Sequence, residues 1–251
     1  MSVIAVERIK LFSTRSPWWC MVVAAVLTIG FAALTTGFLK GADEQQATIF
    51  ITQPGAQLSQ MVMMVMAALA VTTEYRFGTI RTSFQAVPQR TALLLGKTAV
   101  VAFLAGLVGL IAAFGGWGVG NLFVSGADLS INTGAEWRLL AGQGLIFAIS
   151  AVIAVAIGIL IRQSAGAIAI LILWPLLVEN LFNLIPKVGD DMSQWSPFAN
   201  GSSFLNQGQD FGLAGAQGQY AMGPWLALLY FAGWAAALLT IALVSANKRD
   251  A

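Results

Sequence analysis

Six long apolar runs, separated by shorter polar stretches, dominate the hydropathy pattern of this chain. A helix needs about 20 apolar residues to cross the hydrocarbon core of a bilayer. Each run has roughly the length that this rule asks for, so each predicts one transmembrane helix. The six runs cover residues 17–38, 56–73, 98–123, 139–161, 165–185 and 224–245. The predicted fold is an all-α polytopic membrane protein with six transmembrane helices, organised as one domain over residues 1–251.

Two further segments are predicted to lie outside the spans. Residues 2–15 place Ala5, Ile9 and Phe12 at helical spacing, which is typical of an amphipathic helix at the membrane interface. The run after it is too long for the apolar part of a signal peptide, so it is interpreted as a retained anchor. Residues 186–223 are rich in Gly, Gln, Asn and Asp and form a long outer loop. This loop is expected either to hold a short helix around Phe204–Gln207 or to dip partly into the membrane.

The distribution of charged residues predicts the orientation of the chain in the membrane. Only 10% of the residues are charged and 58% are hydrophobic, whereas a soluble domain carries about a quarter charged residues. A net charge of +2 is too small to indicate a nucleic-acid partner. With the N-terminus inside, the cytoplasmic side receives ten of the 13 Lys and Arg residues and the outer side three, which fits the positive-inside rule. Both termini are therefore expected in the cytoplasm.

The residue types present exclude several kinds of chemistry. The chain has no histidine and one cysteine, Cys20, so it offers no Ser-His-Asp triad, no histidine-based zinc site and no internal disulfide. No catalytic residue and no metal ligand is predicted. The stretch LLLGKT (residues 93–98) resembles the end of a phosphate-binding loop, but that loop requires glycine at position 91, which is Thr91. The chain is thus expected to bind no ATP, and Lys97 is interpreted as a cytoplasmic anchor of the third span.

One polar segment, EYRFGTIRTSFQAVPQR at residues 74–90, lies between the second and third spans. Gly78 is expected to break the helix that leaves the membrane, Thr79 to cap a new helix of about two turns, and Pro88 to end it. The apolar stripe of this helix consists of Phe77, Ile80, Phe84 and Val87, and Arg81 and Gln85 face away from it. Such a helix can lie on lipid headgroups or dock into a cleft of another protein.

The same segment resembles the signature of ABC-2-type transporter permeases, E-Y-R-x-G-T-I-R-T followed by x-P-x-R. The matching residues are Glu74, Tyr75, Arg76, Gly78, Thr79, Ile80, Arg81, Thr82, Pro88 and Arg90. The stretch WSPFANGSSFL (residues 195–205) is similar, more weakly, to the P-x-x-x-G-x-x-L region of that family. The number of spans and the interfacial N-terminal helix fit the family as well, so the resemblance covers essentially the whole chain.

The resemblance implies a function for residues 74–90, because in that family the segment contains a coupling helix that sits in a groove of a cytoplasmic ATPase. The implied coupling residues are Glu74, Arg76, Phe77, Gly78, Thr79, Ile80, Arg81, Phe84, Val87, Pro88 and Arg90. The chain would then be the non-catalytic permease subunit of a bacterial ABC exporter in the inner membrane. Its implied partners are the ATPase, which binds ATP and Mg, and a second copy or a related permease. The alternatives are a surface loop that only enforces topology and, for the whole chain, a stand-alone secondary transporter or channel.

Polar residues within the spans are the candidates for a substrate path. Glu179 is the one carboxylate deep in an apolar run, where an ionised group must be paired, protonated or facing water. Asn180 and Asn183 lie close to it, and Trp174-Pro175 predicts a kink below. Gln60 and Met64 in the second span are further candidates, since methionine surfaces adapt to varied ligands. Helix packing explains these residues equally well, although the resemblance places spans two and five beside the path.

Overall fold

The computed structural model describes residues 3–39, 47–86, 89–126, 128–182, 195–207 and 222–248, and every regular element in these ranges is a helix. The elements in chain order are α1 (Val3–Phe12), α2 (Arg15–Phe38), the 3-10 turn η1 (Ile49–Thr52), α4 (Ala56–Arg76), α5 (Thr79–Ala86), α6 (Arg90–Phe123), α7 (Gly134–Ile161), α8 (Ser164–Leu173), the π-helical turn η2 (Trp174–Val178), α9 (Glu179–Phe182), α11 (Pro197–Asn206) and α12 (Pro224–Lys248).

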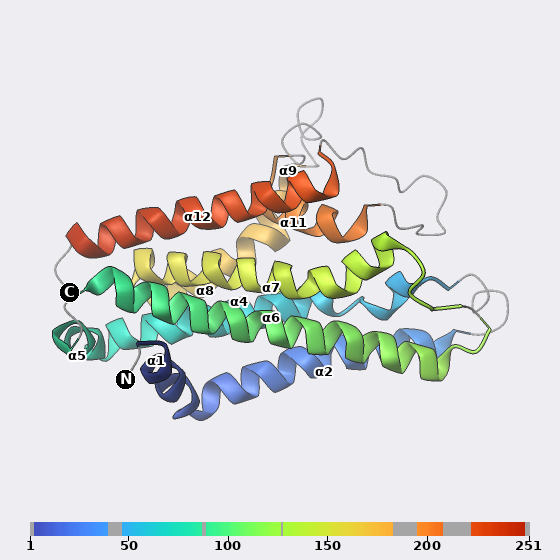
Figure 1. The fold of residues 1–251 in the computed structure, drawn as a ribbon, viewed down its shortest axis with the longest axis horizontal. Coiled ribbons are helices and arrows are strands. Elements are labelled where there is room, and N and C mark those ends of the chain that lie inside the picture. The colour runs from blue at the N-terminus through green and yellow to red at the C-terminus, as the bar shows by residue number, and fades with distance from the viewer. Residues whose placement is uncertain are drawn as a thin grey trace.

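The long helices run side by side as one bundle (Figure 1). Within the described residues five of them, α2, α4, α6, α7 and α12, are long and apolar enough to cross a membrane, and Ser164–Val178 forms a shorter apolar helix at the sixth run. This arrangement confirms the all-α polytopic fold. The largest difference in bounds is at α6, which begins at Arg90 instead of residue 98, because no residue between them breaks the helix.

Helix α7 is the central element of the bundle and packs against α4, α6 and α12. It begins with a capping box in which the Thr133 hydroxyl accepts from the Glu136 N–H at 3.3 Å, while the Glu136 carboxylate accepts from the Thr133 N–H at 2.7 Å. Its contact with α6 depends on paired glycines. A Cβ on Gly106 would lie 3.2 Å from the Gly144 carbonyl oxygen, so the two backbones approach more closely than larger residues allow.

The sixth run is an interrupted helix. Helix α8 widens into the π-helical turn Trp174–Val178 and continues as α9. Pro175 lies in this turn and has no N–H to donate, which explains the irregularity predicted at Trp174-Pro175. Residues 183–185 of the expected span lie outside the described residues. The helix expected around Phe204–Gln207 is α11, which starts earlier, at Pro197.

The two ends of the bundle differ in what they carry. Helices α1 and α5 and the last turn of α12 lie together at one end, called here the α5 end (Figure 1). Helix α11 and the connection between α6 and α7 lie toward the other end, called here the α11 end. The beginning of the first described helix and the end of the last one are therefore on the same side, as an even number of spans requires. That the α5 end is cytoplasmic stays a prediction from the charge distribution.

Candidate functional site

The polar segment after α4 forms a second, separate helix as predicted. Gly78 has a φ of 70°, a left-handed conformation that glycine adopts without strain, and its N–H donates to the Tyr75 carbonyl at 3.3 Å. This glycine ends α4 and reorients the chain. Thr79 is the first residue of α5 rather than its N-cap: its hydroxyl donates to the Glu74 carbonyl at 3.5 Å and so joins α5 to the last turn of α4.

The apolar stripe of α5 is divided between the interior and the surface. Ile80 is 2% exposed, and Phe84 is half-buried against the hydrophobic core, with the Arg90 guanidinium carbon 5.2 Å from its ring centroid. Phe77, by contrast, is 70% exposed. Ile80 therefore packs inside the chain, and Phe77 is the residue of the stripe that stays open among those that the structure describes. Val87 and Pro88 lie outside the described residues.

The outward side of α5 carries mainly polar residues. Arg81, Thr82 and Gln85 are all exposed, which confirms that Arg81 and Gln85 face away from the stripe. Phe77 precedes the helix and stays open, with the guanidinium carbon of the exposed Arg76 5.6 Å from its ring centroid. We call Phe77, Arg81, Thr82 and Gln85 the exposed face of α5. It combines one large aromatic ring with hydrogen-bonding groups, a composition suited to a protein partner.

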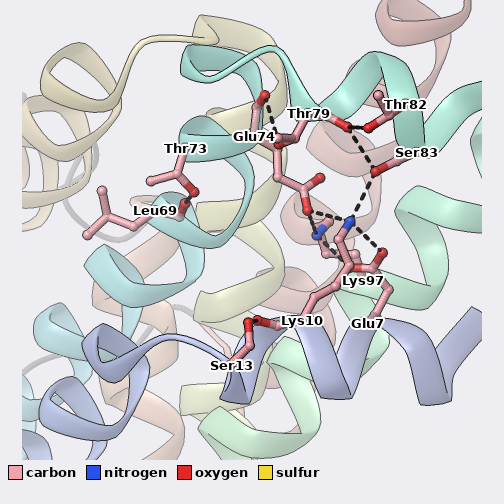
Figure 2. Close-up of polar contacts among 10 residues, drawn as sticks. All are labelled: Glu7, Lys10, Ser13, Leu69, Thr73, Glu74, Thr79, Thr82, Ser83 and Lys97. Carbon is pink, nitrogen blue, oxygen red and sulfur yellow. Dashed lines mark hydrogen bonds and ion pairs between the residues drawn. The ribbon is translucent and has the colours of Figure 1, made fainter.

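Four charged side chains meet directly beneath α5 (Figure 2). The Lys97 ammonium from α6 lies 2.5 Å from Glu7 Oε2 of α1 and 2.9 Å from Glu74 Oε1 of α4. The Lys10 ammonium from α1 lies 2.8 Å from the same Glu74 oxygen and 3.5 Å from Glu7 Oε1. We call Glu7, Lys10, Glu74 and Lys97 the charge cluster. It joins three helices through two positive and two negative groups.

Three members of the charge cluster are almost inaccessible to solvent. Glu7 and Lys97 are each 4% exposed and Glu74 is 9% exposed. Buried charges are tolerated when they are paired, and here each charge has an opposite charge within bonding distance. Burial opposes the charged form of Lys10, but its hydrogen bond to Glu74 and the attraction of Glu74 and Glu7 outweigh burial and raise the pKa of Lys10.

The charge cluster also reaches α5 itself. The Lys10 ammonium donates a hydrogen bond to the Ser83 hydroxyl at 3.0 Å, so one lysine of α1 touches both the buried carboxylates and α5 (Figure 2). This corrects the interpretation of Lys97 as a simple membrane anchor. Sequence reasoning did not single out Glu7. Glu7 could have been found from its place in the predicted topology. Glu7 and Glu74 are acids on the side of the membrane that carries most of the Lys and Arg residues, so ion pairs with these bases could be expected.

A cavity of about 390 Å³ forms the second candidate region, between α4, α7, α11 and the π-helical turn. Three predicted path residues, Gln60, Met64 and Glu179, all line it, although they come from distant parts of the chain. Its polar lining also includes Gln53, Gln57 and Gln143. The side chain of Asn180 and the whole of Asn183 lie outside what the structure describes.

Glu179 has a clear packing role at one wall of this cavity. Its carboxylate accepts hydrogen bonds from the backbone N–H groups of Phe198 at 3.0 Å and Ala199 at 2.8 Å, and from Trp174 Nε1 at 3.2 Å. Phe198 and Ala199 belong to the first turn of α11, where a negative charge is favourable. The buried acid therefore holds α11 against the π-helical turn, in addition to lining the cavity.

Comparison with known proteins agrees with this architecture. No curated protein sequence matches the chain. The model of a protein family described as ABC-2 family transporter protein matches residues 3–177, which include α1, α4, α5 and α6 and hence the complete charge cluster. The match covers more than half of the chain. This protein, a multi-pass membrane protein of the transporter-permease type, belongs to the ABC-2 transporter family.

Proposed function

We propose that this chain is the non-catalytic permease subunit of an ATP-driven exporter and that a separate cytoplasmic ATPase binds the exposed face of α5. The observation that carries the proposal is the two-sided construction of α5. Ile80 fixes one side of the helix in the core of the permease, while Phe77, Arg81 and Gln85 stay open on the other side. A helix held in this way transfers a push from a partner to the bundle instead of bending away from it.

The charge cluster mechanically links α5 to α4, so a displacement of α5 by the partner would also move α4. Ser83 of α5 is bonded to Lys10, and Lys10 and Lys97 hold Glu74 at the end of α4. Helix α4 then continues to Gln60 in the cavity wall, 14 residues away, which is about 21 Å along a helix. A displacement of α5 is therefore coupled to α4 at one end and reaches the cavity at the other.

The remaining parts of the assembly follow from the family. Two copies of this chain, or this chain and a related permease, would enclose the substrate path in the bacterial cytoplasmic membrane, with both termini in the cytoplasm. ATP and Mg would bind to the ATPase and not to this chain, in keeping with the broken phosphate-binding pattern at Thr91. Stand-alone secondary transporters usually carry coupling carboxylates near the midplane. The carboxylate of Glu179 is instead engaged with α11 and Trp174.

The proposal is tested by purifying the tagged chain from its native host in mild detergent. A small P-loop ATPase should co-purify, and the preparation should hydrolyse ATP. Transport by the purified chain alone, driven by an ion gradient, would contradict the proposal. For the orientation, Gln85→Cys and Asp128→Cys are compared in a Cys20→Ser background. A membrane-impermeant thiol reagent should label only the cysteine at position 128 in intact cells, and labelling at position 85 would reverse the assigned sides.

A further inference from the structure

The polar groups inside the cavity at the α11 end are unusual because several have no partner. Gln143 is 2% exposed and lines the cavity, and no described residue forms a hydrogen bond with its carboxamide. Gln53 is 6% exposed; its amide nitrogen donates to Thr52 Oγ1 and to the Ala113 carbonyl, both at 3.0 Å, while its Oε1 has no partner among the described residues. Buried amides are normally paired, so these carboxamides have hydrogen-bonding capacity that a ligand can use.

The charge of the cavity lining indicates which class of ligand the cavity can bind. Within the described lining there is no lysine or arginine, and Glu179 is the one charged side chain. Both oxygens of that carboxylate already accept hydrogen bonds from the first turn of α11. The free polar capacity therefore belongs to neutral carboxamides, each of which offers donors and an acceptor. An anionic ligand would meet the negative charge of Glu179 with no lysine or arginine in the described lining to offset it. A cationic ligand would have to share a carboxylate whose two oxygens already accept three hydrogen bonds.

We propose that this cavity binds a neutral, polyhydroxylated group of about the size of a sugar, either a free molecule or part of a larger cargo. The inference rests on the proposed transport function, since it names the class of substrate. A hydroxyl donates and accepts at the same atom, so it can satisfy either end of a carboxamide whose position is fixed. The cavity volume of about 390 Å³ lies within the usual range for small-molecule sites. Met61 and Met64 supply apolar surface beside the amides.

The test measures binding through protection of a cysteine at the rim. Ser202 lines the cavity and is exposed, so Ser202→Cys in a Cys20→Ser background gives a reactive thiol with little change in size. Ser130→Cys, on the exposed connection between α6 and α7, is the matched control outside the cavity. The full chain is placed in lipid nanodiscs without any ATPase, and the rate of thiol modification is measured with glucose, glucosamine or glucuronate. The three probes share one ring and differ in charge.

Glucose should slow modification of Ser202→Cys by about threefold at a concentration of twice its Kd, and it should not affect Ser130→Cys. Glucosamine and glucuronate should protect less. Gln143→Met keeps the shape of the side chain and removes its hydrogen bonds, so glucose binding should weaken by about tenfold. Protection that is equal for the three probes overturns the neutral class, and no protection at all overturns the site. Either failure is distinct from failure of the proposed function, which is read from ATPase co-purification. If Gln143→Met does not fold, the three probes on Ser202→Cys still test whether the cavity prefers a neutral sugar.

Discussion

Lys10 and Ser83 are 73 residues apart in the chain, yet the Lys10 ammonium donates to the Ser83 hydroxyl at 3.0 Å. The same ammonium lies 2.8 Å from Glu74, so a single side chain of α1 connects α5 to the last turn of α4. The Ser83 hydroxyl also donates to the Thr79 carbonyl at 3.0 Å. Removing it deletes these two hydrogen bonds, each of which contributes about 0.5–1.5 kcal/mol net, so the fold should stay largely intact. Loss of the Ser83 hydroxyl should instead weaken the mechanical coupling between α5 and the other helices of the bundle.

We therefore expect Ser83→Ala to retain its ATPase but to transport less substrate per ATP hydrolysed. Thr82→Ala is the matched control, since the Thr82 hydroxyl donates to the Thr79 carbonyl at 2.8 Å and has no bond to Lys10. Both variants are reconstituted with the ATPase in liposomes, and transport and ATP hydrolysis are measured together. An equal ratio in the two variants would show that the bond to Lys10 plays no part in coupling.

Lys97 is expected to be essential for the stability of the α5 end. Lys97→Met leaves Glu7 and Glu74 buried with only Lys10 between them, and removing one partner of a buried ion pair typically costs about 3–5 kcal/mol. The variant should unfold at a clearly lower temperature than the parent in the same detergent. Lys248→Met removes an exposed lysine at the same end and should have almost no effect. Adding Glu7→Gln to Lys97→Met should recover part of the loss, because it removes the uncompensated charge.

Ile80 is expected to matter as an internal anchor of α5. Ile80→Ala removes a side chain that is 2% exposed, a change that usually costs about 2–5 kcal/mol in a packed core. Because Ile80 holds a short helix, the effect should be local. Hydrogen exchange of the backbone amides in 79–86 should accelerate while exchange in α7 stays slow. Unchanged protection of α5 would mean that Ile80 does not fix the helix to the bundle.

Glu179 is expected to act mainly through the position of α11. Glu179→Leu leaves the donors of Phe198, Ala199 and Trp174 without an acceptor, and each buried unsatisfied group costs about 1–3 kcal/mol. Glu179→Gln keeps one acceptor oxygen and should lose much less stability. Trp174→Phe, which removes one of the three donors, should be milder than Glu179→Leu. Thermal unfolding of the three variants checks this order, and equal stability of all three would exclude the capping role.

Much of this architecture could be predicted from local patterns. The apolar runs and the break at Gly78 are encoded within a few residues of where they act, and the structure confirms both. The direction of the stripe on α5 could not be predicted in this way. An apolar stripe is buried equally well by a partner or by the chain itself, and only the tertiary structure shows that Ile80 packs inward.

The role of Lys97 illustrates the same limit for charges. A lysine at the start of an apolar run reads as an anchor at the lipid headgroups, because its partners, Glu7 and Glu74, lie 90 and 23 residues away in the sequence. The bonds from Glu179 to α11 likewise span 19 and 20 residues of the chain. Charge balance hinted at the charge cluster, since few acids lie on the basic side, but which helices it joins depends on how the bundle packs.

The most direct test of the account is whether the exposed face of α5 holds the ATPase. Phe77 is the large apolar side chain that this face leaves open, and loss of such an anchor typically costs about 2 kcal/mol or more in binding free energy. The measurement is the amount of ATPase that co-purifies with Phe77→Ala, compared with Trp19→Ala, which removes another exposed aromatic side chain outside α5. The account predicts that Phe77→Ala loses most of its ATPase at normal permease yield while Trp19→Ala keeps it. A full complement of ATPase on Phe77→Ala, and on Phe77→Ala combined with Arg81→Glu, would contradict it.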